Sequence, residues 1–285
     1  MTHSCLTCRP GPDSVIDYDT QIIQLPQRFR GPPASGNGGI ATGLIACLGE
    51  KLLGEPIQRI SSRLIRAVPL ASPMTFTSQI TEPNTVSISI GDSDGPAFTG
   101  WASKDSSTPI MSNETVALLA SNAVLTKEKL DRFENHVEQL NPSSADFAGC
   151  FVCGPKAEFG LRLRPRPVTD EISWLSWDPG ERWTDDNRLA LLPAIASLDC
   201  TAAIGFHREG HLTQDESALL GSFDATIIEK PPTRPAGNLR IVARTRSRDR
   251  RKIFTDIGLF SPTGQPYVLG LATWIVVTPE KARGK

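Results

Sequence analysis

Residues 192–206 (LPAIASLDCTAAIGF) form the stretch that decides the fold. The run is apolar and rich in small residues, which predicts a buried helix. It carries one carboxylate, Asp199, and no Lys or Arg lies within eight residues on either side. Burying a carboxylate is costly unless backbone donors, a partner or a substrate compensates for the charge. Asp199 is therefore either a residue that caps or hydrogen-bonds locally or a catalytic carboxylate beside a pocket.

The composition limits the partners of the chain. Its 285 residues suffice for two ordinary domains or one fused double unit. A net charge of -1 gives no reason to expect nucleic acid or an anionic membrane. No apolar run approaches the roughly 20 residues that span a bilayer, and residues 1–19 lack the apolar core of a signal peptide. We expect a cytoplasmic protein, in which the six cysteines are thiols or metal ligands rather than disulfides.

The first half combines one helix with several strands. A glycine-rich loop over 30–39 runs into an apolar helix predicted for 40–53. The loop either holds a negatively charged oxygen on its free N–H groups or forms a tight start to a buried helix. Short β-rich runs follow at 57–68, 74–82, 85–91 and 97–103. A further helix is predicted over 113–140, with Asn113 as its N-cap, and 141–144 mark a break.

The second half repeats this order. Strand-like residues 171–177 precede the 192–206 helix, and four β-rich runs follow at 219–230, 238–247, 252–260 and 267–277. A repeat of this length implies duplication of one helix-plus-sheet unit. Because a single unit would leave exposed sheet edges, we expect the two units to pair side by side in one larger sheet.

Several motifs resemble those of hotdog proteins. The first half contains Asn37-Gly38-Gly39 at its helix start, and the second half opens with GCFVCGP over 149–155, followed by Gly-Leu at 160–161. Duplicated in one chain, this pattern is similar to the double hotdog of type II acyl-CoA thioesterases. The resemblance implies an α+β fold in which two tandem hotdog units each wrap a long helix in an antiparallel sheet. It divides the chain into a tail (1–21), a first unit (22–105), a helical linker (106–148) and a second unit (149–285).

The resemblance also implies a site. Type II acyl-CoA thioesterases orient a water with an Asp on the second helix, a Thr at the start of the next strand and a Gln in the last strand. Asp199 fits the first position, Ser222 falls near the second and keeps the hydroxyl, and Thr273 stands near the third in place of Gln. Leu44 occupies the slot equivalent to Asp199 in the first unit. We therefore expect at most one active site per chain.

Thioester hydrolysis needs a base or nucleophile and a group that holds the oxyanion. Asp199 could activate water or attack directly. Backbone N–H groups at a helix start, near Ala194 or near Gly38 and Gly39, could bind the oxyanion. Asn37 either reaches the site that holds Asp199 or is a turn residue.

A basic strand offers a second candidate for substrate binding. Arg240, Arg244, Arg246 and Arg248 fall at even positions, so they are predicted to project from one face. They either bind the phosphates of coenzyme A or of a carrier protein's phosphopantetheine arm, or form the charged solvent face of an outer strand.

The cysteines are spaced for metal binding. Cys5 and Cys8, like Cys150 and Cys153, have the spacing of half a tetrahedral zinc site, so the two pairs together could bind a structural zinc. Cys47 and Cys200 are predicted to be small core residues. His207 and His211 are spaced to bind metal, but a solvated helix cap explains them better.

We expect an acyl-thioester hydrolase that requires no cofactor and whose substrate is an acyl-CoA or an acyl group on a carrier protein. For the cysteine pairs, a structural zinc and free thiols both stay open. Two alternatives stay open. One is a hotdog hydratase or dehydratase, which would need a His beside the carboxylate. The other is a non-catalytic acyl-thioester-binding protein. The strands at the unit edges suggest a homo-oligomer, most simply a dimer.

Overall fold

The computed structural model describes residues 14–124 and 147–284, apart from 170, 186, 209–210, 214 and 233–237. Cys5 and Cys8, most of the predicted tail and the second part of the helix predicted over 113–140 lie outside the described residues. The side chain of His207 is also outside them.

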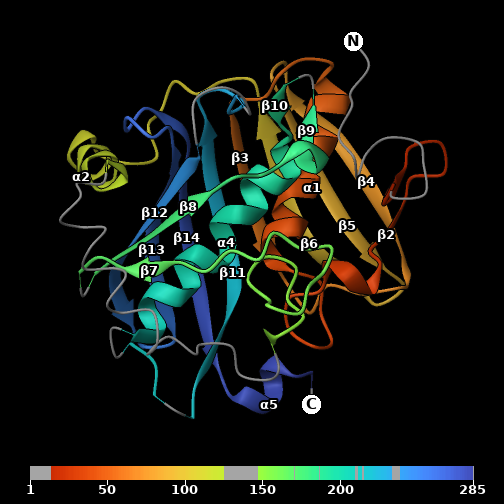
Figure 1. Cartoon of the computed structure of the whole chain (residues 1–285). Coiled ribbons are helices and arrows are strands. Elements are labelled where there is room, and N and C mark those ends of the chain that lie inside the picture. Colours follow the sequence, from red (N-terminus) through yellow and green to blue (C-terminus); the bar gives the residue numbers. More distant parts are fainter. Residues whose placement is uncertain are drawn as a thin grey trace.

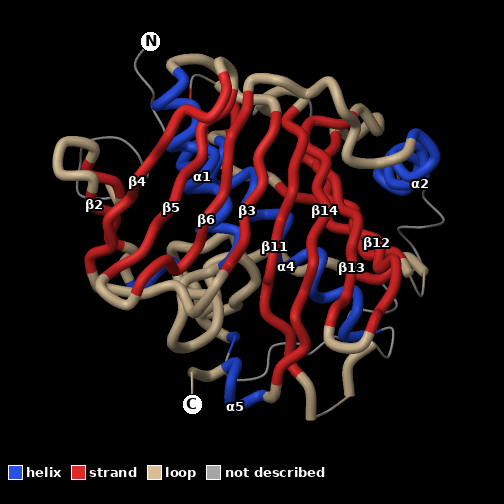
Figure 2. Tube along the Cα trace, turned by 180° about the vertical axis from the view of Figure 1, so that it is seen from behind, coloured by secondary structure: helices blue, strands red, loops and turns tan. Residues whose placement is uncertain are grey.

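One antiparallel sheet organises the molecule (Figure 2). Its twelve strands run in the order β1-β2-β4-β5-β6-β3-β11-β14-β13-β12-β8-β7. The end of the predicted tail supplies β1 (Ile16–Asp17), and the first unit supplies β2 (Ile22–Gln24), β3 (Arg59–Leu64), β4 (Pro73–Glu82), β5 (Thr85–Asp92) and β6 (Gly95–Ser103). The second supplies β7 (Arg166–Pro167), β8 (Ile172–Trp177), β11 (Ser217–Ile227), β12 (Leu239–Asp249), β13 (Lys252–Phe260) and β14 (Pro266–Val277). A small separate sheet pairs β9 (Thr184–Asp185) with β10 (Arg188–Leu189).

The two units join through β3 and β11. These strands pair antiparallel, with Ser61 opposite Asp224 and Ser62 opposite Phe223. Each strand would otherwise expose an edge, and the pairing removes both edges. The expected union of two units in one sheet is therefore confirmed.

Two long helices cover one face of the sheet (Figure 1): α1 (Gly38–Leu53) and α4 (Leu191–Arg208). They pack directly against each other, because glycines in α1 allow close approach. A Cβ on Gly39 would lie 2.8 Å from the Cα of Ala196, and one on Gly43 would lie 3.0 Å from the Cα of Leu192. α1 ends at Gly54, whose φ of 69° suits a left-handed C-cap.

The shorter helices flank this core. α2 (Asn113–Ala123) packs on the opposite face of the sheet, where Leu119 and Ala123 belong to one buried cluster with Val242 and Phe260. Its N-cap is Ser112, not Asn113 as predicted, because the Ser112 hydroxyl accepts the N–H of Thr115. The described residues also form the short helices η1 (Gln27–Phe29), η4 (Glu181–Trp183) and α5 (Pro279–Ala282). Within the described ranges, no helix has the length and apolar character needed to cross a membrane.

Candidate active site

Asp199 lies on the side of α4 that meets the start of α1. Its side chain is 3% exposed, and its Oδ2 accepts the backbone N–H of Gly39 at 2.8 Å. This contact depends on a residue without a side chain, since a Cβ on Gly39 would come within 2.7 Å of the Asp199 Cβ. The first unit thus supplies a main-chain donor to the carboxylate of the second.

Burial dominates the protonation of this carboxyl. It raises the pKa of Asp199 to about 7, although the Gly39 N–H and the Asn37 side chain act in the opposite direction. No Lys or Arg of the described chain forms an ion pair with it. A carboxyl with such a pKa can exchange a proton with water at neutral pH.

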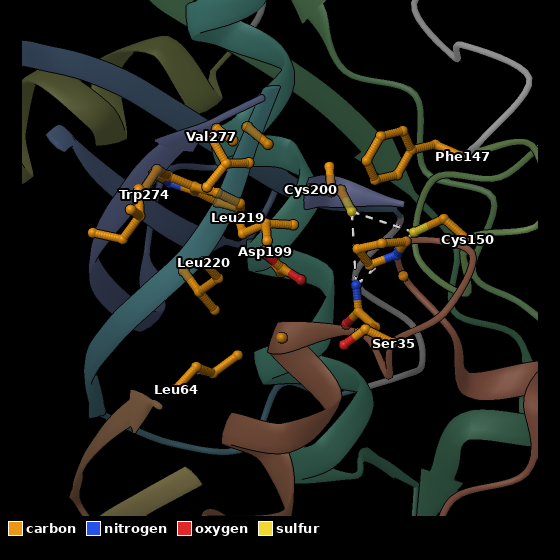
Figure 3. Close-up of a pocket in the computed structure, with 18 of the residues that line it drawn as sticks. Ser35, Leu64, Phe147, Cys150, Asp199, Cys200, Leu219, Leu220, Trp274 and Val277 are labelled. Atoms are coloured by element: carbon orange, nitrogen blue, oxygen red, sulfur yellow. Dashed lines mark hydrogen bonds between the residues drawn. The ribbon is translucent and has the colours of Figure 1, made fainter. Parts of the chain in front are cut away.

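Asp199 faces a cavity of about 550 Å³ (Figure 3). Its walls are largely apolar and come from both units, with Leu64 and Phe147 joined by residues of β11 and β14 such as Leu220, Trp274 and Val277. Among the described residues that line it, Asp199 is the only acidic one. An apolar cavity with few polar groups is the usual form of a small-molecule site.

Asn37 and Gly38 bring the start of α1 to the same cavity. The Asn37 Oδ1 accepts the N–H of Ile40 at 3.0 Å, so this residue caps the helix. Its Nδ2 faces Cys150 and Cys200, 3.9 and 3.8 Å from their sulfur atoms. The N–H of Gly38 belongs to the first turn of α1 and has no acceptor within the described part of the chain. It is therefore available to an oxyanion.

Three cysteines converge beside Asp199. The sulfur atoms of Cys150, Cys153 and Cys200 lie within 4.8 Å of one another, and those of Cys150 and Cys200 are 3.6 Å apart. The neighbouring Cys153 and Cys200 thiols lower the pKa of Cys150, and the interaction with Cys150 raises the pKa of Cys153 and of Cys200. Cys200 is buried in the core, as predicted, and it also lines the cavity. Its place directly after the lone carboxylate is the sequence signal for this second position.

Ser222 and Thr273 do not join this group. They pair with each other across β11 and β14, and Ser222 also faces Arg63 of β3. Their neighbours Phe223 and Ala272 point into the core under the helices, so the two hydroxyls lie on the opposite face of the sheet. A β-bulge between Leu220 and Ser222 sets this register. Neither residue is among those described as lining the cavity.

Ala194 is also unavailable as an oxyanion donor. It is fully buried, its N–H donates to the Ala190 carbonyl at 3.1 Å, and it does not belong to the described lining of the cavity.

The predicted arginine row lies on β12, which is flanked by β8 and β13 and is not an outer strand. Arg240 donates to Ser176, Arg244 lies 3.6 Å from Glu171, and Arg246 lies 3.4 Å from Asp256. A register shift at Arg246 breaks the alternation, so Arg248 turns to Glu216 and the four side chains do not share one face. None of them belongs to the described cavity lining.

Among the described residues, five other cations line the cavity, all of them exposed or half-buried and here called the rim cations: Arg66, Arg164, Arg166, Arg251 and Lys281. No motif in the sequence indicates them as a group. Arg66 is paired with Asp92, and Arg251 donates to the Val276 carbonyl. These residues come from loops, strand β7 and helix α5, and they belong to both units, so no single run of the sequence indicates them.

No family model and no curated protein sequence matches this chain. Solved structures do. A putative thioesterase II from Thermobifida fusca matches with a TM-score of 0.62 at 13% identity, covering 93% of this chain and 95% of its own. A tesB protein of Mycobacterium avium subsp. paratuberculosis matches with a TM-score of 0.58 at 12% identity, covering 90% and 92%.

A dehydratase belongs to the same set of similar structures. The dehydratase domain of PpsC from Mycobacterium tuberculosis, solved in complex with C12:1-CoA, matches with a TM-score of 0.58 at 10% identity, covering 92% of this chain and 97% of its own. Together with the sheet and its two helices, these matches show a double hotdog fold. The particular chemistry has to be argued from the cavity.

Proposed function

We propose that this protein hydrolyses acyl thioesters in the cavity beside Asp199. The observation that carries the proposal is that one buried carboxylate, held by the Gly39 N–H at 2.8 Å, faces an apolar cavity. The apolar walls suit an acyl chain, and the carboxylate suits a water-activating base.

The reaction needs three events. Asp199 accepts a proton from water as the water oxygen attacks the thioester carbonyl carbon. The Gly38 N–H, at the positive end of the α1 dipole, supports the negative charge on the carbonyl oxygen. The C–S bond then breaks, and the thiolate leaves with the proton that Asp199 returns.

The rim cations favour an anionic thiol carrier as the leaving group. Arg164, Arg166 and Lys281 lie around a cavity whose interior is apolar, which matches an acyl chain joined to a phosphate-bearing arm. We therefore propose an acyl-CoA, or an acyl group on a carrier protein, as the substrate class.

The test is thiol release from short, long and aromatic acyl-CoAs by the wild type and by Asp199→Asn. The variant keeps an acceptor for the Gly39 N–H but cannot take a proton, so turnover should fall about 10²–10⁴-fold. Asp224→Asn, on the outer face of β11, is the matched control and should keep wild-type turnover. Equal turnover by wild type and Asp199→Asn would overturn the proposal.

The PpsC match makes a hydratase or dehydratase the second candidate. Such enzymes would need a His beside the carboxylate, and no described residue lining this cavity is a His. Enoyl-CoA and 3-hydroxyacyl-CoA belong in the same substrate panel. Their interconversion without thiol release would favour this candidate, and acyl-CoA binding without any turnover would favour an acyl-binding protein.

A further inference from the structure

The three thiols beside Asp199 have the spacing of a metal site. A tetrahedral zinc ion with Zn–S bonds of about 2.3 Å sets its sulfur ligands about 3.8 Å apart. The sulfur atoms of Cys150 and Cys200 are already 3.6 Å apart, and all three sulfur atoms lie within 4.8 Å of one another. A shift of about 1 Å in the longer separations would complete the geometry.

Cys150 and Cys153 lie on a tight turn. The turn closes with the Gly154 N–H donating to the Cys150 carbonyl at 2.8 Å, and a Cβ on Gly154 would lie 2.5 Å from the Cys150 backbone N and O. The turn therefore holds the two sulfur atoms close together, within 4.8 Å of the Cys200 sulfur on α4.

The groups directly beside the three sulfur atoms favour a cation. The three thiols and the Asp199 carboxylate can all become anionic, and all four line the same cavity. No Lys or Arg ion pair with Asp199 occurs among the described residues. Asn37 adds an amide donor that faces both Cys150 and Cys200, and its own Oδ1 is fixed by the Ile40 N–H. Such donors orient metal ligands from the second layer.

We propose that Cys150, Cys153 and Cys200 bind one Zn²⁺ ion through three thiolates, with the fourth coordination position open to the cavity that holds Asp199. Thiolate sulfur selects a soft or borderline cation, and Zn²⁺ is the commonest such ion. All three cysteines line the cavity, so a water or a ligand in the cavity can complete the tetrahedron. Binding releases the thiol protons and changes no oxidation state.

This site differs from the one predicted from the two Cys-x-x-Cys pairs. Cys200 of α4 replaces the tail cysteines, so the ion would fasten the 150–153 loop to the helix that carries Asp199. The inference does not depend on the proposed hydrolysis, because metal binding can be measured without any substrate.

The test is metal titration of the full chain after reduction and chelation. We expect one Zn²⁺ or Co²⁺ per chain, and the cobalt form should show sulfur-to-metal charge transfer and the ligand-field bands of a tetrahedral site. Cys153→Ser and Cys200→Ser should each lower the affinity for Zn²⁺ by more than the roughly 10–100-fold that is typical when a residue hydrogen-bonded to a metal ligand is changed. Asn37→Ala should lower the affinity within that range.

Three controls define the site. Cys47→Ser changes a buried cysteine outside the cluster and should keep wild-type affinity. The Cys5→Ser/Cys8→Ser double variant should also keep wild-type affinity for the metal. If this variant loses the metal, the tail supplies a ligand, and the proposal of an open fourth coordination position is wrong. A short alkanethiol should change the cobalt spectrum if that position is open.

Two results would reject the proposal as a whole. One is a wild-type chain that binds no metal, including one whose mass and thiol count show a Cys150–Cys200 disulfide instead. The other is a Cys200→Ser variant that binds Zn²⁺ as tightly as the wild type.

Discussion

The backbone N–H of Gly39 donates to the carboxylate of Asp199 at 2.8 Å, across the contact between α1 and α4. The donor comes from the first unit and the acceptor from the second. The two units are therefore chemically different, because the first contributes a main-chain group and the second contributes the acidic side chain. Leu44, which the sequence predicts to stand in the slot of the carboxylate in the first unit, is fully buried.

Gly39→Ala should destabilise the protein. The new Cβ would meet the Asp199 Cβ and the Ala196 Cα below 3.0 Å, and overpacking of this kind costs about 1–3 kcal/mol. Gly43→Ala is the matched variant, because its nearest contacts are all at 3.0 Å, so its cost should be smaller. Urea unfolding of both variants measures the difference. A Gly39→Ala protein as stable as the wild type would show that the contact between α1 and α4 has room for a methyl group.

Asn37→Ala should lose about 1 kcal/mol of stability, because the Ile40 N–H loses its capping oxygen. Asn37→Ser keeps a capping hydroxyl and should recover most of the loss. Thermal and urea unfolding compare the two. If the Asn37→Ser protein is as unstable as the Asn37→Ala protein, Asn37 stabilises the fold through the contacts of its Nδ2 with the two sulfur atoms, not through the helix cap.

Arg164→Ala and Lys281→Ala should raise KM for acyl-CoA about 2- to 5-fold each, with kcat nearly unchanged, since exposed charge pairs contribute up to about 1 kcal/mol. An acyl-pantetheine, which lacks the nucleotide phosphates, should show no such change. Arg240→Ala is the control, because Arg240 lies outside the cavity lining and donates to Ser176. An equal KM effect in the control would mean that overall charge is responsible.

The Glu216–Arg248 pair should make stability depend on acid. Hydrogen bonds from the Arg248 guanidinium, and then from the Thr213 N–H, lower the pKa of Glu216 to about 2, below the 4.5 of a free Glu. The pair therefore stabilises the folded state above about pH 4.5, and this contribution is lost as the pH falls towards 2. Glu216→Gln should be less stable than the wild type at pH 6, and the gap should narrow on acidification. Urea unfolding of both proteins from pH 6 down towards pH 2 measures the difference in their free energy of unfolding. A difference that stays constant over this range would contradict the prediction.

The sequence predicted the architecture well because hydrophobic alternation and turn residues repeat in both halves. The run predicted at 252–260 matches β13, and the 192–206 helix extends by only a few residues at its ends. The lone carboxylate and the Asn-Gly-Gly loop also indicated residues that line the cavity, namely Asp199, Asn37 and Gly38.

The residues that the sequence misplaced share a physical cause. Ser222 follows one β-bulge and Arg246 sits at another, and a bulge of one residue transfers every later side chain to the other face. Strict alternation cannot reveal such a shift. The place of Cys200 beside two other thiols was missed for a different reason: Cys150 lies 50 residues before it in the sequence and meets it only when the loop folds onto α4.

The continuous β3–β11 ladder has a consequence for selectivity. Because backbone hydrogen bonds join the two units edge to edge, the cavity cannot widen by swinging one unit away from the other without breaking that ladder. Its size is therefore governed by the side chains in its walls, such as Trp274, whose indole N–H donates to the Thr255 hydroxyl at 3.2 Å. Selectivity for the ligand should accordingly change through substitution of single wall residues and not through movement of whole units.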